Sequence, residues 1–261
     1  MHQQAQRLAG KTIIVTGGAQ GIGAAVAAQI VAQGARAVVA DIDEAGARKV
    51  CESLTRDAGL AEPALLDVRD EAAFAALAAG VLAQHGRIDG LVNNAGINVK
   101  YEPLAMPSGE WDRCHDVNLK GAWNGCRAVL PAMIAQRAGS IVNMASVHGH
   151  QIIPRSFPYP VFKAGLLGMT RALGVEFAAS GVRVNSISPG YVETPLLDAW
   201  LASVPDPAAT RAAAEALIPA RRFARAEEVA MTAIFLLSDD APYITATDIA
   251  IDGGRMALFH D

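Results

Sequence analysis

The 261-residue chain is short of several features, and each shortage excludes a class of protein. Its three cysteines, Cys51, Cys114 and Cys126, are far apart and show no metal-ligand spacing, so the sequence predicts reduced thiols and no metal site. The longest apolar runs, such as residues 231–237, fall far below the ~18 residues of a membrane span. Residues 1–10 are polar and lack the apolar core of a signal peptide. A cytoplasmic protein is therefore expected.

Neither sign of charge dominates, and aromatic residues are scarce. The 22 basic and 26 acidic residues give a net charge of −4, which indicates neither a nucleic-acid partner nor an anionic membrane. Aromatic residues make up 5% of the chain, which argues weakly against a large flat substrate. The length suits one large α/β domain better than two small ones, so we expect a single domain over residues 1–261.

Short β-branched segments alternate with helical segments along the chain. A strand over 11–16 leads into a glycine-rich turn and a helix over 24–33, and a second strand over 37–40 ends at Asp41. Buried β-branched runs between helices indicate a parallel sheet covered on both faces. The predicted fold class is therefore α/β, a doubly wound parallel sheet of the Rossmann type in three α/β/α layers. Further strands are expected at 64–66, 90–92, 140–144 and 182–187, with a helix over 71–84.

One segment falls outside this alternation. Residues 188–225 are rich in proline and in short helical pieces. In a doubly wound sheet the loops at the carboxyl ends of the strands form the ligand crevice. We therefore expect this segment to be a substrate lid.

The glycine-rich turn carries the first chemical signature, TGGAQGIG over residues 16–23. Gly17 permits a tight turn, Gly21 lets the backbone approach a pyrophosphate, and Gly23 allows the helix to pack closely on the strand. The following helix offers free N–H groups to the phosphates. For this motif alone, a purely structural turn is the alternative. The downstream Asp41 favours a dinucleotide, because a carboxylate at that strand end accepts hydrogen bonds from ribose hydroxyls.

The same carboxylate predicts NAD rather than NADP as the cofactor. It repels a 2′-phosphate, and its neighbours Ala40, Ile42 and Asp43 include no base that would attract one. Gln20 in the glycine-rich turn is likewise uncharged.

A tyrosine and a lysine supply the second signature. Tyr159 and Lys163 in YPVFK lie on one helical face about a turn apart, and Pro160 suits the first turn of a helix. A phenol has an unperturbed pKa of ~10, and a nearby ammonium favours the phenolate. Lys163 is therefore expected to lower the pKa of Tyr159 towards the working range of a general base. The pair alone is suggestive, since the same spacing also arises by chance.

These motifs, and others in the same order, resemble those of the short-chain dehydrogenase/reductase family in its single-domain branch. The resemblance covers about residues 8–254. TGGAQGIG is similar to the family's cofactor turn, and NNAG over 93–96 to the segment that supports its sheet. Residues 251–254 resemble its closing strand, and the interval between Ser146 and Tyr159 is the family's usual one.

The resemblance implies a catalytic tetrad and a set of cofactor-binding residues. Ser146 and Tyr159 would hold the reacting oxygen, Lys163 would stabilise the phenolate, and Asn118 would anchor a water that relays protons. Taken singly, Ser146 has the alternative of capping a turn, Asn118 that of a helix-surface residue, and Asp67 that of a turn aspartate. The residues implied at the cofactor are Gly17, Gln20, Gly21, Ile22, Gly23, Asp41, Asp67, Val68, Asn94, Ala95, Gly96, Tyr159, Lys163, Pro189, Gly190, Val192 and Thr194.

The loop before Tyr159, VHGHQIIPRSFP, is polar and predicts the substrate class. A guanidinium suits carboxylate recognition, which makes Arg155 a candidate anchor, while His148 and Gln151 suit hydroxyls. With Ser146 and Tyr159 they form the expected substrate site. A local ion pair or a solvent-facing position is the alternative for Arg155. We expect a polyol, sugar or sugar acid, and similarity to the family's bacterial sugar-acid dehydrogenases favours the 4-dehydrogenation of 2-keto-3-deoxy sugar acids such as fuconate or rhamnonate derivatives.

Two other functions compete with this interpretation. A reductase of 3-ketoacyl thioesters would prefer NADPH and a basic docking surface, against which Asp41 and the net charge argue. A non-catalytic NAD-binding protein would usually lack a member of the tetrad.

The resemblance also implies a homotetramer packed through the helices around 111–136 and 161–179. The tail over 255–261 then either covers a neighbour's active site or frays.

Overall fold

The computed structural model describes residues 6–54 and 60–258. Within them a sheet of seven strands has the order β11-β8-β6-β4-β1-β2-β3, and every neighbouring pair is parallel. The strand order reverses between β1 and β4, the position at which doubly wound sheets bind their ligands. The strands are β1 Thr12–Thr16, β2 Arg36–Asp41, β3 Ala61–Leu65, β4 Gly90–Asn93, β6 Gly139–Met144, β8 Val182–Pro189 and β11 Asp248–Ile251.

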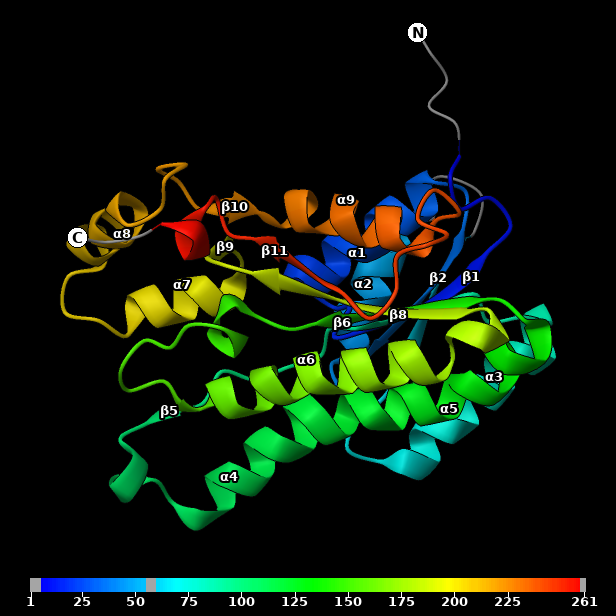
Figure 1. The fold of residues 1–261 in the computed structure, drawn as a ribbon, viewed down its shortest axis with the longest axis horizontal. Helices are drawn as coiled ribbons and strands as arrows, with labels where there is room; N and C mark the ends of the chain where they lie inside the picture. Colours follow the sequence, from blue (N-terminus) through cyan, green and yellow to red (C-terminus); the bar gives the residue numbers. More distant parts are fainter. Residues whose placement is uncertain (1–5, 55–59, 259–261) are drawn as a thin grey trace, which may run out of the picture.

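Helices cover both faces of the sheet, which confirms the predicted three-layer α/β/α class (Figure 1). Each helix buries an apolar face against β-branched strand residues, so one hydrophobic core lies on either side of the sheet. On one face lie α1 Gly21–Ala32, α2 Glu44–Leu54 and α9 Ala226–Leu237, and on the other lie α3 Glu71–His85, α5 Gly121–Gln136 and α6 Tyr159–Glu176.

Several boundaries differ from the sequence prediction by a few residues, as at β3, which covers Ala61–Leu65 instead of 64–66, and two further differences affect the architecture. The closing strand β11 ends at Ile251, and Gly253 and Gly254 follow it with φ of +63° and +87°, a left-handed backbone that ends the strand. The long helix expected over 111–136 is divided: α4 Ser108–His115 passes through a π-helical turn, η2 Asp116–Lys120, before α5 begins. An extra residue in such a turn re-aims side chains, and these turns frequently occur at functional sites.

Short elements gather at the carboxyl ends of the strands, at the left of Figure 1. The predicted lid segment contains α7 Pro195–Ala202 and α8 Pro207–Ala216. Two short strand pairs brace this end: β5 Lys100–Tyr101 runs antiparallel to β7 Phe157–Pro158, and β9 Val192–Glu193 runs parallel to β10 Ala224–Arg225. The short 3-10 helices are η1 Pro103–Ala105, η3 Val147–Gly149 and η5 Arg255–Ala257, and a further one, η4 Ala178–Ser180, directly precedes β8 at the other end of the sheet.

None of the helices in the described ranges is long and apolar enough to cross a membrane. The predicted tail lies only partly within these ranges. Residues 255–258 are described, and residues 259–261 lie outside them.

Candidate active site

A cavity of about 1170 Å³ opens at the carboxyl ends of the central strands and is closed on one side by α7 and α8. Parallel strands place the residues that follow them at a single edge of the sheet, so segments far apart in the sequence meet there. The predicted residues that line the cavity are Gly17, Gln20, Gly21, Ile22, Asp41, Asp67, Val68, Asn94, Ala95, Gly96, Asn118, Ser146, His148, Gln151, Arg155, Tyr159, Lys163, Pro189, Gly190, Val192 and Thr194.

Gly23 is the exception among the predicted cofactor residues, since it does not line the cavity. A Cβ atom there would collide with the carbonyl oxygen of Gly17 and come within 2.6 Å of Asn94 Nδ2. Gly23 therefore permits close packing beneath the turn, as its place in the motif suggests, rather than contact with a ligand.

The glycine-rich turn fits a pyrophosphate. Gly17 and Gly21 have φ of +65° and +55°, which favour glycine, and Asn94 Nδ2 donates to the carbonyl oxygens of Thr16 and Gly17 at 3.0 and 2.9 Å. At the start of α1, Gln20 makes no capping side-chain hydrogen bond and the first turn contains no acidic residue. The N–H groups and the positive end of the helix dipole are thus not countered by a local side chain.

Two carboxylates lie at the predicted adenosine end of the cavity. Asp41 accepts the N–H groups of Ala19 and Asp43, each at 2.9 Å on a different oxygen, so its carboxylate is oriented and each oxygen keeps a lone pair for a hydroxyl. Asp67 pairs with Arg69 through Oδ1–Nε and Oδ2–Nη2 distances of 2.9 and 2.6 Å, and this hydrogen bonding lowers the pKa of Asp67. Asp67 also accepts the backbone N–H of Arg69, so it is both a turn aspartate and part of the cavity wall.

The tetrad side chains converge at the opposite end. Tyr159 begins α6, and Lys163, 4% exposed, lies one turn further with its Nζ 5.5 Å from the Tyr159 ring centroid. Lys163 Nζ donates to the carbonyl oxygen of Met144 at 2.6 Å. Ser146 follows β6, and its Oγ accepts the backbone N–H of His148 at 3.1 Å. The serine therefore caps a turn and faces the cavity at once, so the two interpretations of Ser146 are compatible.

Burial outweighs the expected effect of Lys163 on the pKa of Tyr159 in this structure. Burial raises the pKa of Tyr159 to about 12. A hydrogen bond with Ser146 acts in the opposite direction and lowers this pKa. Burial also lowers the pKa of Lys163 to about 8. A low-dielectric site favours the neutral form of each group, and here desolvation outweighs the predicted attraction.

Asn118 lies in the π-helical turn and is 1% exposed, so the helix-surface alternative is wrong. Its Nδ2 donates to the carbonyl oxygens of Ile97 and Cys114 at 3.1 and 3.0 Å, and its Oδ1 accepts the N–H of Ile97 at 3.2 Å. The side chain thereby ties the turn to the loop that follows β4.

The predicted substrate residues have three different environments. His148 packs its ring edge-on against Tyr159 at 5.8 Å, and burial, with the charge of Lys100, lowers its pKa. Gln151 Nε2 donates to the carbonyl oxygen of Met256 at 3.1 Å, which joins the loop to the C-terminal segment. Arg155 is exposed and has no ion pair within residues 6–54 and 60–258, so the local-carboxylate alternative for it is not observed.

Sequence reasoning missed Lys100 in the cavity wall, and it included Trp200 and Met256 only as parts of the predicted lid and tail. No local motif marks them. Lys100 reaches the site because β5 pairs with β7, Trp200 because α7 folds over the strand ends, and Met256 because the chain turns back after β11. For Lys100, the one available signal in the sequence was a polar lysine shortly after the NNAG motif.

Known proteins resemble the chain over nearly its whole length. A family model described as enoyl-(acyl carrier protein) reductase matches residues 17–255. The 3-oxoacyl-acyl-carrier-protein reductase FabG of Thermotoga maritima is 39% identical over 252 residues, 95% of this chain and 98% of its own. D-threitol dehydrogenase of Mycolicibacterium smegmatis is 39% identical over 249 residues, 95% of this chain and 94% of its own. A solved structure from Burkholderia xenovorans, described as a short-chain dehydrogenase/reductase, has a TM-score of 0.94 at 36% identity and covers 97% of this chain and 99% of that one.

Proposed function

The chain belongs to the short-chain dehydrogenase/reductase family, and from that premise we propose that it is an NAD-dependent dehydrogenase of a polyol, sugar or sugar acid. Family membership makes it an oxidoreductase that uses a nicotinamide cofactor. One observation carries the finer proposal: Ser146 and Tyr159 line the same cavity as the polar loop between them. Arg155 in this loop has no ion pair among the described residues, so it can bind a ligand.

Asp41 supports the choice of NAD over NADP. Its carboxylate is held at the end of β2 by two backbone N–H groups, in the place from which it repels a 2′-phosphate. The glycine cradle and the uncapped start of α1 fit the pyrophosphate of either cofactor, so the discrimination rests on Asp41.

The proposed mechanism assigns one task to each tetrad residue. When bound, the nicotinamide accepts the hydride of an alcohol or donates one to a ketone. Ser146 Oγ and the Tyr159 phenol hold the reacting oxygen, and Tyr159 takes its proton during oxidation or returns it during reduction. Lys163 supports the phenolate form of Tyr159, and Asn118 holds the loop at Ile97 that closes this side of the site.

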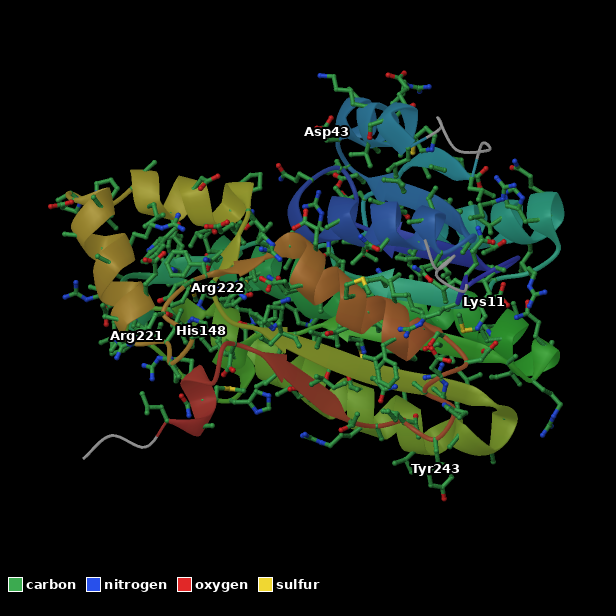
Figure 2. The ribbon with its side chains drawn as sticks, turned by 90° about the horizontal axis from the view of Figure 1, so that it is seen from above. Lys11, Asp43, His148, Arg221, Arg222 and Tyr243 are labelled. Carbon is green, nitrogen blue, oxygen red and sulfur yellow. The ribbon has the colours of Figure 1, made fainter. Side chains whose placement is uncertain are left out.

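A 3-ketoacyl-thioester reductase is the second candidate, favoured by the similarity to FabG. Such an enzyme needs a free basic surface for an acidic carrier. Figure 2 shows Arg221 and Arg222 at the same end of the molecule as His148. However, Arg222 pairs with Glu228 through two hydrogen bonds of 2.7 Å, and Arg221 donates to the carbonyl oxygen of Ala216. Arg222 is neutralised, but Arg221 keeps its charge, so the preference for a polyol or sugar-acid substrate rests on Asp41 and the polar loop before Tyr159 rather than on these arginines.

The proposal also covers location and assembly. We infer a cytoplasmic homotetramer of a single-domain subunit in which residues 188–225 act as the lid. Leu197, Trp200 and Leu217 of this segment line the cavity, which supports the lid role.

The test is NADH formation from NAD with neutral sugars, polyols, aldonates and 2-keto-3-deoxy sugar acids. We expect turnover with members of this panel, NAD preferred over NADP, and Tyr159→Phe to reduce kcat at least about 100-fold with little change in NAD affinity. Equal efficiency with NADP, or faster NADPH-linked reduction of a 3-ketoacyl thioester, would refute the proposal.

A further inference from the structure

Lys100 is held beside the tyrosine by backbone pairing. In the β5–β7 ladder it lies opposite Pro158, the residue before Tyr159. Its side chain lines the cavity, and its Nζ is 5.1 Å from the centroid of the Trp200 ring on the lid helix α7. A strand pair therefore fixes the Lys100 backbone, and an aromatic face packs against its ammonium.

The ammonium of Lys100 lacks a counter-ion. No carboxylate pairs with it in the part of the chain that the structure describes, whereas the cavity-lining Arg69 and Arg113 pair with Asp67 and Glu110. Desolvation lowers the pKa of Lys100. Lys100 is exposed by area, so its ammonium can reach a partner from the cavity, and a wall cation without a carboxylate of its own can pair with one that a ligand brings.

Two polar atoms of neighbouring cavity residues are also without partners. Asn98 Oδ1 and His148 Nδ1 are buried and form no hydrogen bond within residues 6–54 and 60–258. Asn98 is two residues from Lys100 in the sequence, and His148 lies close enough to the lysine to feel its charge. Buried unsatisfied polar atoms are rare in folded proteins, and a carboxamide and a neutral imidazole both suit hydroxyl groups.

We propose that Asn98, Lys100 and His148 form a substrate subsite specific for an acid, in which Lys100 binds the carboxylate and the other two bind adjacent hydroxyls. The inference rests on the proposed function and narrows its substrate from polyols, sugars and sugar acids to hydroxy acids. It also assigns the carboxylate anchor to Lys100, whose backbone is fixed by β5 opposite Pro158, rather than to Arg155.

The test is the binding of D-gluconate to the NAD-loaded protein, followed by tryptophan fluorescence, with D-glucitol as the neutral counterpart. Lys100→Met keeps the aliphatic stem over Trp200 and removes the charge, and Lys100→Arg restores the charge. We expect Lys100→Met to raise the Kd of gluconate by about 10- to 100-fold, the strength of a charge-assisted contact. Lys100→Arg should recover most of the affinity, and glucitol binding should not respond to either variant. Lys49→Met, at an exposed lysine of α2, is the matched control.

Three results would overturn the subsite: no saturable gluconate binding to the wild type, an unchanged Kd in Lys100→Met, or a larger loss in Arg155→Ala than in Lys100→Met. Turnover decides the proposed function separately. If polyols are oxidised but gluconate binding ignores Lys100, the subsite falls and the dehydrogenase stands. If nothing in the panel is oxidised but gluconate binding depends on Lys100, the subsite stands and the proposed function falls.

Discussion

Tyr159 and Lys163 are adjacent on α6, and burial acts on their protons in opposite directions. The phenol keeps its proton to higher pH, with a pKa of about 12, and the ammonium loses its proton at lower pH, with a pKa of about 8. Both shifts favour the neutral form, as expected where few waters stabilise a charge. At neutral pH the tyrosine is therefore a proton donor, and a working phenolate requires further positive charge near the ring.

Lys163→Met tests the buried ammonium through stability. The folded-state pKa of about 8 lies below the unfolded value of 10.5, so between these pH values the unfolded chain holds a proton that the folded protein has released. Wild-type stability should then rise with pH relative to the variant, by about 3 kcal/mol across the window. Denaturant unfolding at several pH values measures the difference.

Tyr159→Phe tests the raised pKa of the tyrosine, for which stability should change with pH in the opposite direction. Because the folded pKa of Tyr159 is raised, the wild type should lose stability relative to Tyr159→Phe as the pH rises from 10 to about 12. For the lysine, a stability difference between the wild type and Lys163→Met that does not change between pH 8 and 10.5 would contradict a folded-state pKa of about 8.

At the scale of elements, the π-helical turn η2 decides where the tetrad asparagine points. A continuous α-helix from Ser108 to Gln136 would carry Asn118 in a different direction. The turn instead buries it against the loop after β4, where one side chain satisfies both backbone groups of Ile97. This loop leads directly to Lys100.

Asn118→Ala should therefore affect stability and catalysis together. It leaves the N–H and carbonyl of Ile97 without their partner, which costs about 1–3 kcal/mol. We expect kcat to fall more than NAD affinity, since Ile97 packs in the same apolar cluster as Tyr159, whereas the hydrogen bonds from this loop to the glycine-rich turn are made by Asn94. Thermal unfolding, kcat and NAD titration measure the three effects.

Asn124→Ala is the matched control. Asn124 is also a buried asparagine, on α5, but its Nδ2 donates to the carbonyl oxygen of Val68 at 2.9 Å, in a turn whose Asp67 and Val68 are predicted to bind the cofactor. This variant should weaken NAD binding more than kcat. If Asn118→Ala lost stability with kcat intact, the asparagine would serve the fold alone.

At the scale of the whole molecule, one helical layer leaves large apolar side chains in solvent. Trp111 on α4, Trp123 on α5 and Val161 on α6 are 37%, 41% and 43% exposed. Exposed apolar groups that gather into one patch mark association surfaces, and these three lie on helices α4, α5 and α6. The positions agree with the helices from which the homotetramer was predicted, and the assembly remains a prediction.

Trp123→Glu tests that assembly. A carboxylate in an apolar interface is costly to desolvate, so the variant should shift the protein from tetramers to smaller species, as measured by sedimentation velocity. Leu65→Glu, at an exposed leucine on the edge strand β3, should leave the distribution unchanged. A variant that remains tetrameric would exclude this helical face as the interface.

Asn118 and Ser146 were assigned through the family resemblance, whereas local patterns in the sequence by themselves predicted the parallel sheet, the glycine-rich turn and the spacing of Tyr159 and Lys163. Each of these depends on a short-range property: β-branched runs for the strands, left-handed φ at Gly17 and Gly21 for the turn, and helical spacing for Tyr159 and Lys163. Strand ends were predicted less well, as at β11, because pairing partners far along the chain set them.

Only the tertiary structure decided which groups are desolvated and which distant segments meet. It surrounded the buried Lys163 and the half-buried Tyr159 with enough protein to raise the pKa of the tyrosine instead of lowering it. It also brought Lys100 to the cavity through β5 and β7 and tied Gln151 to Met256. Burial and long-range pairing depend on the packing of the whole chain, so the residues next to a position in the sequence do not reveal them.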